Sequence, residues 1–79
     1  MKIETDDDRL VLLSAFRYAL GRKTYIPSVI ADQIKSCWID LTESDRRLIK
    51  REISEAIERG HAGHECDVDR WNEILLLDS

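Results

Sequence analysis

The stretch from Thr42 to Gly60 reads TESDRRLIKREISEAIERG, and it is the clearest secondary-structure signal in the chain. Its apolar residues recur at the three- and four-residue spacing of one helical face. Asp45 follows Thr42 by three residues, which is close to the capping-box pattern that begins a helix. Gly60 is the residue type that ends one. Pattern, start and stop therefore agree on a helix over residues 43–59.

Three further segments of the 79-residue chain show helical spacing of apolar residues, together with residue types that begin or end helices. Thr5 and the aspartates after it can cap a first helix, and Gly21 can end it. Pro27 suits the first turn of a second helix, and Asp67 or Asp69 can cap a short last one. The four predicted helices cover 8–20, 27–38, 43–59 and 68–77. Because no run shows strand alternation, the sequence predicts a single all-α domain, a compact bundle of about four short helices.

The composition excludes several classes of protein. Hydrophobic residues make up 43% of the chain and charged residues 35%, a mix too apolar for a disordered tail and too charged for a membrane span. The N-terminal segment over 1–8 has no apolar core of a signal peptide, and the two cysteines are expected as free thiols. We therefore expect a cytoplasmic protein. A chain this short has little room for a catalytic cleft, so we expect no enzyme.

Charge is distributed unevenly along the chain. The net charge is −4, but residues 1–8 carry −3, residues 9–51 carry +5 and residues 52–79 carry −6. Two interpretations fit this asymmetry. Either oppositely charged segments face each other within the fold, or a charged surface meets a charged partner.

Basic side chains gather on the third predicted helix. Their positions, at spacings that place them along one side, are Arg46, Arg47, Lys50 and Arg51. Together with Arg17, Arg22 and Lys23 they can follow a phosphate backbone, so a small nucleic-acid-binding regulator is the alternative function.

Two features oppose that alternative. Acidic residues stand four positions from several bases of this helix, in the pairs Glu43–Arg47, Arg51–Glu55 and Glu55–Arg59. Pairs at this spacing can neutralise each other within one helix. The net acidity of the chain also works against nonspecific affinity for nucleic acid.

A cluster of zinc-type ligands stands in the loop before the last predicted helix. His61, His64 and Cys66 lie within six residues, and Cys37 can supply a fourth ligand. The spacing matches no established zinc motif, so we predict no cofactor and keep zinc as the alternative. A nucleophilic pair of Cys66 with His64 lacks any recognisable oxyanion loop.

Three stretches together resemble a family of small phage and prophage proteins. They are AFRYALGRKTY over 15–25, LIKREI over 48–53 and CDVDRW over 66–71. The resemblance implies a bacterial host cell and a mobile-element origin, and it brings no established active-site residues. Small phage proteins often bind and block host machinery, including CRISPR–Cas and other defence complexes, which is an analogy between kinds of protein rather than between sites.

The sequence therefore predicts a non-enzymatic, protein-binding module that inhibits or modulates a host machine. Exposed arginines and aromatic residues dominate protein interfaces. On that ground the predicted contact residues are Arg17, Tyr18, Arg22, Tyr25, Arg47, Lys50 and Arg51. A homodimer is also compatible, since the apolar arc of the first helix is broad.

Overall fold

The computed structural model of the chain describes residues 2–22 and 26–78, and its regular structure there is helical. The elements are α1 (Asp6–Ala19), α2 (Ile26–Ser36), the 3-10 turn η1 (Trp38–Asp40), α3 (Glu43–Glu58) and α4 (Glu65–Leu75). No strand occurs in these described ranges, and the predicted all-α bundle of four helices is confirmed. Within the same ranges no helix has the length and apolarity needed to cross a membrane.

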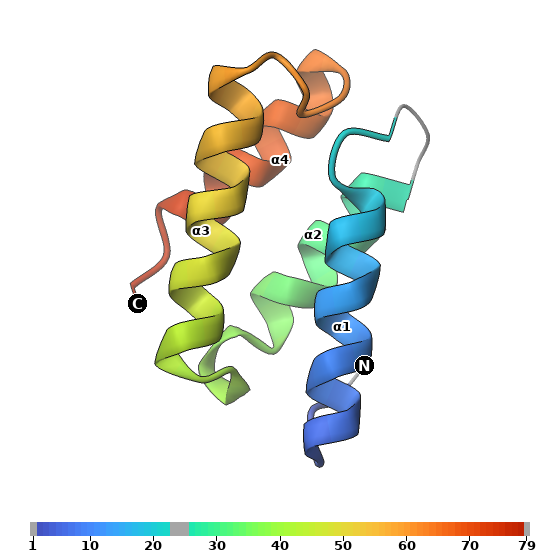
Figure 1. The fold of residues 1–79 in the computed structure, drawn as a ribbon, viewed down its shortest axis with the longest axis vertical. Coiled ribbons are helices and arrows are strands. Elements are labelled where there is room, and N and C mark those ends of the chain that lie inside the picture. Colours follow the sequence, from blue (N-terminus) through green and yellow to red (C-terminus); the bar gives the residue numbers. More distant parts are fainter. Residues whose placement is uncertain (1, 23–25, 79) are drawn as a thin grey trace.

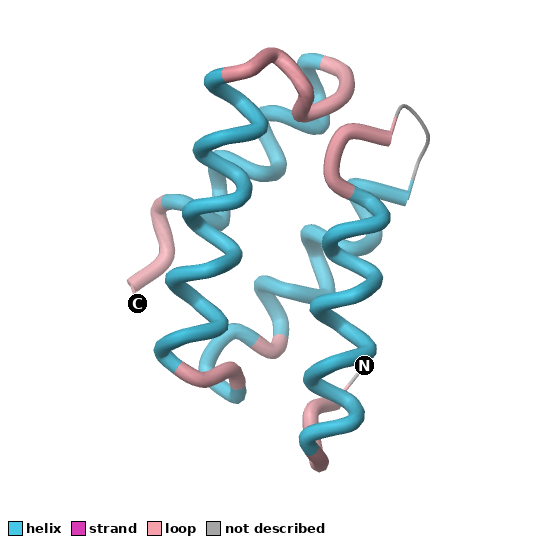
Figure 2. The backbone as a smooth tube through the Cα atoms, viewed as in Figure 1, coloured by secondary structure: helices cyan, strands magenta, loops and turns pink. Residues whose placement is uncertain are grey.

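The four helices form two layers (Figure 1). Helices α1 and α3 lie in front, and α2 and α4 lie behind them. Helix α2 contacts both α1 and α4, and α4 in turn contacts α3. The tube view shows the helix-connecting loops at the two ends of the bundle and the C-terminal segment beside α3 (Figure 2). Each helix thus turns one face towards a shared interior.

Aromatic rings from the two layers meet in that interior. Phe16 of α1 and Trp71 of α4 are fully buried, with ring centroids 5.7 Å apart and planes at 78°. This edge-to-face arrangement is one that aromatic pairs prefer. The aliphatic core around them includes Leu12, Ile34, Ile49, Ile53 and Ile74. Leu10 of α1 is 52% exposed, because the buried face of the helix centres on Leu12 and Phe16.

The start of α1 is a closed capping box. The Asp8 backbone N–H donates to Thr5 Oγ1, and the Thr5 N–H donates to Asp8 Oδ2, each over 3.2 Å. The predicted role of Thr5 is confirmed, and the helix begins at Asp6, two residues before the predicted start. Three aspartates stand in its first turn, where the helix dipole favours negative charge.

The start of α3 uses only half of the predicted capping box. Thr42 Oγ1 accepts from the Asp45 N–H over 3.1 Å, but the Asp45 carboxylate does not return the bond. It accepts instead from Arg9 Nη1 of α1, at 2.9 and 3.0 Å to its two oxygens. Because Asp45 is buried, this ion pair ties the first turns of α1 and α3 together.

The second helix ends earlier than predicted. We expected it to reach Trp38, but α2 ends at Ser36 and the chain continues through Cys37 into η1. The break directs the indole of Trp38 towards the end of the chain, where Nε1 donates to the Asp78 carbonyl over 2.6 Å.

The fourth helix begins earlier than predicted. Neither Asp67 nor Asp69 is the cap, because α4 begins at Glu65 with His64 as the N-cap residue. Asp67 occupies the third helical position, and its buried carboxylate accepts from the His64 N–H over 3.1 Å. Cys66, expected in a loop, is therefore an exposed residue of the first turn.

Opposite charges on α2 and α4 face each other. Lys35 Nζ lies 2.6 Å from Glu73 Oε2, and Arg70 Nη1 lies 3.3 Å from Asp32 Oδ1. The hydrogen bond and charge of Lys35 lower the pKa of Glu73 from its ordinary value. These contacts agree with the first interpretation of the charge asymmetry, since basic Lys35 meets an acid of the C-terminal segment.

Candidate functional site

Two loops meet at the end of the bundle where α1 and α3 finish. Glycines bring their backbones into direct contact. Gly21 has φ +88°, and a Cβ there would lie 2.6 Å from the His61 carbonyl oxygen. Gly63 has φ +89°, and a Cβ there would lie 3.0 Å from the Arg22 carbonyl oxygen. Only glycine accepts both the left-handed backbone and the close approach without strain. The contact between the two loops therefore depends on glycine at both positions.

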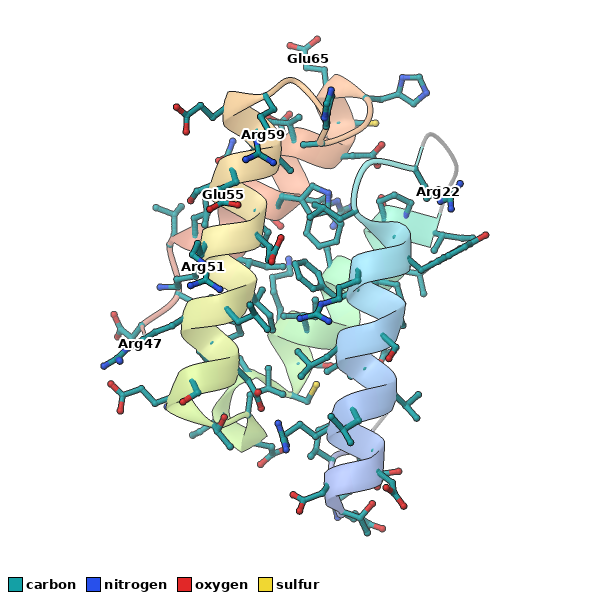
Figure 3. The ribbon with its side chains drawn as sticks, in the orientation of Figure 1. Arg22, Arg47, Arg51, Glu55, Arg59 and Glu65 are labelled. Carbon is teal, nitrogen blue, oxygen red and sulfur yellow. The ribbon has the colours of Figure 1, made fainter. Side chains whose placement is uncertain are left out.

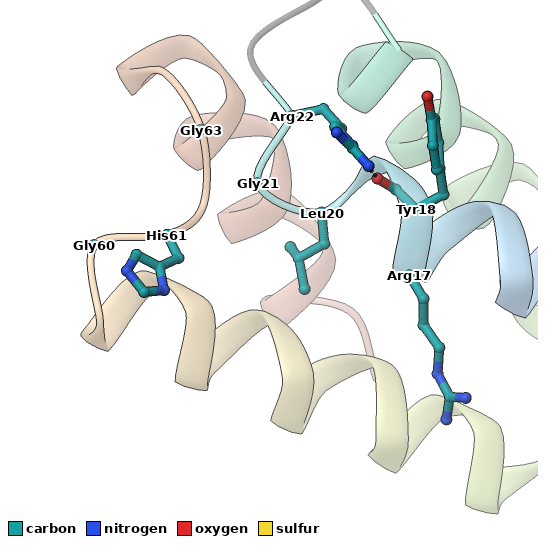
Figure 4. A pocket seen from close by; sticks show the side chains of 8 residues that line it. All are labelled: Arg17, Tyr18, Leu20, Gly21, Arg22, Gly60, His61 and Gly63. Atoms are coloured by element: carbon teal, nitrogen blue, oxygen red, sulfur yellow. Dashed lines mark hydrogen bonds between the residues drawn. The ribbon is translucent and has the colours of Figure 1, made fainter.

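An open pocket of about 440 Å³ lies between these loops and the last turn of α1 (Figure 4). Its described lining consists of Arg17, Tyr18, Leu20, Gly21, Arg22, Gly60, His61 and Gly63. Three of the predicted contact residues are thus brought together. A fourth, Tyr25, lies outside the described residues, as does Lys23.

Arg22 and Tyr18 form a stacked pair at one side of the pocket. The guanidinium carbon of Arg22 lies 4.5 Å from the centroid of the Tyr18 ring. Arg22 Nε also donates to the Tyr18 carbonyl over 3.2 Å. These two contacts order the pair. Tyr18 nevertheless remains 57% exposed, so the pair is accessible to solvent. Such ordering lowers the entropy lost when these side chains bind a partner.

The charge of the pocket is positive. Its described lining includes Arg17, Arg22 and His61, and none of the described lining residues carries a carboxylate. Neither Arg17 nor Arg22 forms an ion pair within the part of the chain that the structure describes. Arg17 and His61 lie on opposite sides of Leu20, while Arg22 lies beside Tyr18 (Figure 4). The basic side chains are therefore spread along the hollow.

The predicted basic stripe on α3 divides between two directions. Arg47 and Arg51 are exposed on the outer side of the helix (Figure 3). Lys50 turns instead towards the C-terminal segment, where its amine donates to the Leu77 carbonyl and lies 5.7 Å from the Trp38 ring centroid. Lys50 is therefore engaged within the fold, whereas Arg47 and Arg51 lie on the outer side of the helix.

Of the three predicted charge pairs along α3, one forms. Arg47 lies 2.5 Å from Glu43. Arg51, Glu55 and Arg59 follow along the same side (Figure 3), yet in the described structure Glu55 forms no ion pair with either arginine. Arg51 and Arg59 are exposed and carry charge that no described residue neutralises.

The candidate zinc ligands, kept as the alternative to no cofactor, do not come together in the part of the chain that the structure describes. Among residues 2–22 and 26–78 no group of three or more His, Cys, Asp or Glu side chains is placed to hold a metal ion. Cys37 is buried, and that burial raises the pKa of its thiol, whereas Cys66 is exposed at the start of α4. His61 instead lines the basic pocket, a role that the sequence analysis missed.

The contact between the two loops predicts unequal effects for two glycine substitutions. Gly21→Ala should lower the free energy of unfolding by about 2 kcal/mol, because it adds a collision with the His61 carbonyl to a strained φ. Gly60→Ala is the matched control. Gly60 has φ +73° but nothing within 4 Å of an added Cβ, so strain alone should cost about 1 kcal/mol. Urea unfolding measures both, and equal losses would contradict the tight approach of the loops.

Comparison with other proteins identifies no family for the chain. The resemblance to small phage proteins stays a prediction, and it supplied no site residues to test against this pocket. The function is therefore inferred from the geometry and charge of the chain's own residues. No family model, curated protein or solved structure matches the chain.

Proposed function

We propose that the protein is a non-enzymatic module that binds a partner protein through the C-terminal end of α1. The observation that carries this proposal is the ordered, exposed stack of Tyr18 and Arg22 at the rim of a pocket that also contains Arg17. Tyrosine and arginine are among the residues that contribute most to protein interfaces. Here they are held in place before any partner arrives.

Apolar residues on α1 extend the same surface. Val11 precedes Tyr18 by seven residues, which places both on one side of the helix. Leu10 is 52% exposed and Val11 is 57% exposed, so two aliphatic side chains and one aromatic ring lie in solvent along one helix. An apolar centre bordered by arginines is the composition of a protein interface.

The lining of the pocket supports binding rather than catalysis. Nucleophilic catalysis needs a nucleophile, a base within hydrogen-bonding reach and a group that orients the base. The described lining contains no Ser, Thr or Cys, and His61 has no carboxylate beside it there. The hollow is also open to solvent rather than enclosed.

The narrower assignment, to a phage-encoded inhibitor of a host machine such as a CRISPR–Cas complex, rests on the resemblance of the sequence. The nucleic-acid alternative draws less support from the structure than the protein-binding one. Lys50 is engaged by the C-terminal segment and Arg47 by Glu43, which leaves Arg51 and Arg59 as the unneutralised bases on the outer side of α3.

Affinity capture with matched variants tests the proposal. Tagged wild-type protein, Tyr18→Ala/Arg22→Ala and Arg47→Ala are each incubated with nuclease-treated bacterial lysate, and bound proteins are quantified by mass spectrometry. We expect a partner that the wild type and Arg47→Ala retain equally. Its recovery on the double variant should fall at least about tenfold, because both replaced residues are of the type that dominates interfaces.

The double variant should keep its fold, since Tyr18 and Arg22 are both exposed. Circular dichroism checks this before capture. Recovery of the same proteins at the same level by all three baits would overturn the proposed surface. Retention of nucleic acid alone, from lysate without nuclease, would favour the alternative function.

A further inference from the structure

We infer that the pocket between α1 and the α3–α4 loop receives an extended acidic peptide segment of the partner protein. The inference rests on the proposed function, because it specifies the chemistry of the partner at that site. Three features of the pocket carry it: the charge of its two arginines, the spacing of its basic side chains and its unpaired backbone donors.

The charge of the pocket is complementary to an acidic segment. Arg17, Arg22 and His61 contribute to its described lining, and no described lining residue offsets them. Elsewhere, Arg9, Lys35 and Arg70 are each paired with a carboxylate. A cluster of unneutralised bases in a protein of net charge −4 attracts acidic groups to one defined place.

The spacing of the basic side chains favours an extended ligand over a single ion. Arg17 and His61 lie on opposite sides of Leu20, and Arg22 lies beside Tyr18 (Figure 4). One small anion cannot contact groups on both sides of a leucine side chain at once. A peptide in extended conformation presents successive side chains along its length, so its carboxylates can reach several of these bases.

Two glycines of the same lining also have unpaired backbone N–H groups. The N–H groups of Gly21 and Gly63 have no hydrogen-bond partner among the described residues. Polar backbone groups covered by a partner need hydrogen bonds, and carbonyl or carboxylate oxygens of an extended peptide supply them. Leu20, which is half-buried, offers an apolar contact between the charged groups.

A peptide suits this site better than nucleic acid. A polynucleotide binds through many phosphate contacts along its backbone, which requires a long track of bases. Here the bases are few, and the segment over 52–79 surrounding the α3–α4 loop is acidic overall. A short peptide brings fewer negative charges near these acidic residues than a polynucleotide does, so the repulsion is weaker for the peptide.

Fluorescence anisotropy with a labelled synthetic peptide tests the inference. The peptide alternates Asp and Ser over about eight residues, enough to span the hollow when extended, and a control peptide has Asn in place of Asp. We expect the wild-type protein to bind the acidic peptide at least about tenfold more tightly than the Asn peptide. Arg17→Gln and Arg22→Gln should each weaken binding about fivefold, which corresponds to one charged contact.

Arg47→Gln is the matched control, because Arg47 is also an exposed arginine but lies outside the pocket and is paired with Glu43. Its affinity for the acidic peptide should equal that of the wild type. Equal weakening by Arg47→Gln and Arg17→Gln, or equal affinity for both peptides, would overturn the inference. Tighter binding of a single-stranded oligonucleotide of equal charge, lost in Arg17→Gln, would also overturn it and assign the pocket to nucleic acid.

The outcomes separate this inference from the proposed function. If the acidic peptide does not bind while protein capture still depends on Tyr18 and Arg22, the inference fails and the protein-binding function stands. If capture also becomes independent of those residues, both fail.

Discussion

Trp71→Ala will remove about 4 kcal/mol from the free energy of unfolding, the largest effect we expect from a single substitution. Trp71 is fully buried and its ring stands against Phe16, which also is fully buried. Truncation removes a large apolar surface and leaves a cavity that neighbouring helices cannot close without moving. A domain of 79 residues has a total stability of about 4–12 kcal/mol, so this substitution should remove about a third or more of it.

Trp71→Phe provides the control for that prediction. The indole Nε1 of Trp71 is buried without a hydrogen-bond partner in the described structure. Phenylalanine keeps an aromatic ring against Phe16 and removes this unpaired donor, so we expect a loss below about 1.5 kcal/mol. Urea unfolding followed by far-ultraviolet circular dichroism measures both variants. A loss below about 1 kcal/mol for Trp71→Ala would contradict the central position of this ring.

Asp45→Ala will lower the free energy of unfolding by about 3 kcal/mol. The Asp45 side chain is 9% exposed and that of Arg9 is 24% exposed, so the substitution leaves a largely buried guanidinium without its carboxylate. Breaking one side of a buried ion pair costs more than the pair contributes, because the remaining charge keeps its desolvation penalty. The expected loss is at the low end of the range for broken buried ion pairs, about 3–5 kcal/mol. The reason is that the Arg9 guanidinium is partly exposed to solvent and its Nε lies 3.8 Å from Asp6 Oδ1.

A double substitution distinguishes this cause from simple loss of contact. Arg9→Met/Asp45→Leu removes both charges and keeps apolar volume, so its stability should recover towards the wild type. Glu73→Gln is the exposed counterpart, and it should leave the free energy of unfolding nearly unchanged because the pair with Lys35 is solvated. If the double variant is no more stable than Asp45→Ala, desolvation of Arg9 is not the cause.

Local sequence was sufficient to predict that the helices exist. The cap at Thr5, the glycines that end α1 and α3, and the apolar spacing of α3 all act within a few residues. The predicted helix boundaries were less accurate where a polar residue could either cap a helix or accept a hydrogen bond within its first turn. Aspartate is a residue type that favours the N-cap position. Asp67 lies instead at the third position of α4, where its carboxylate accepts from the backbone N–H of His64, the N-cap residue.

The candidate site was predictable in part. Arg17, Tyr18 and Arg22 were expected as contact residues from their types, and the structure places all three at one pocket. His61 was named only as a metal ligand. Lys50 was expected at the surface, but the carbonyl of Leu77 lies within reach of its amine, which no spacing within α3 reveals.

The sequence by itself determined an acidic, all-helical domain whose helices begin and end at recognisable residues, because capping and periodicity depend on neighbours along the chain. Only the tertiary structure decided which distant residues meet. Arg9 pairs with Asp45 across 36 positions, and Gly21 lies against His61. These contacts depend on how the helices pack, and the same apolar faces are compatible with several packing angles. The pocket exists because one packing brings two glycine-containing loops together.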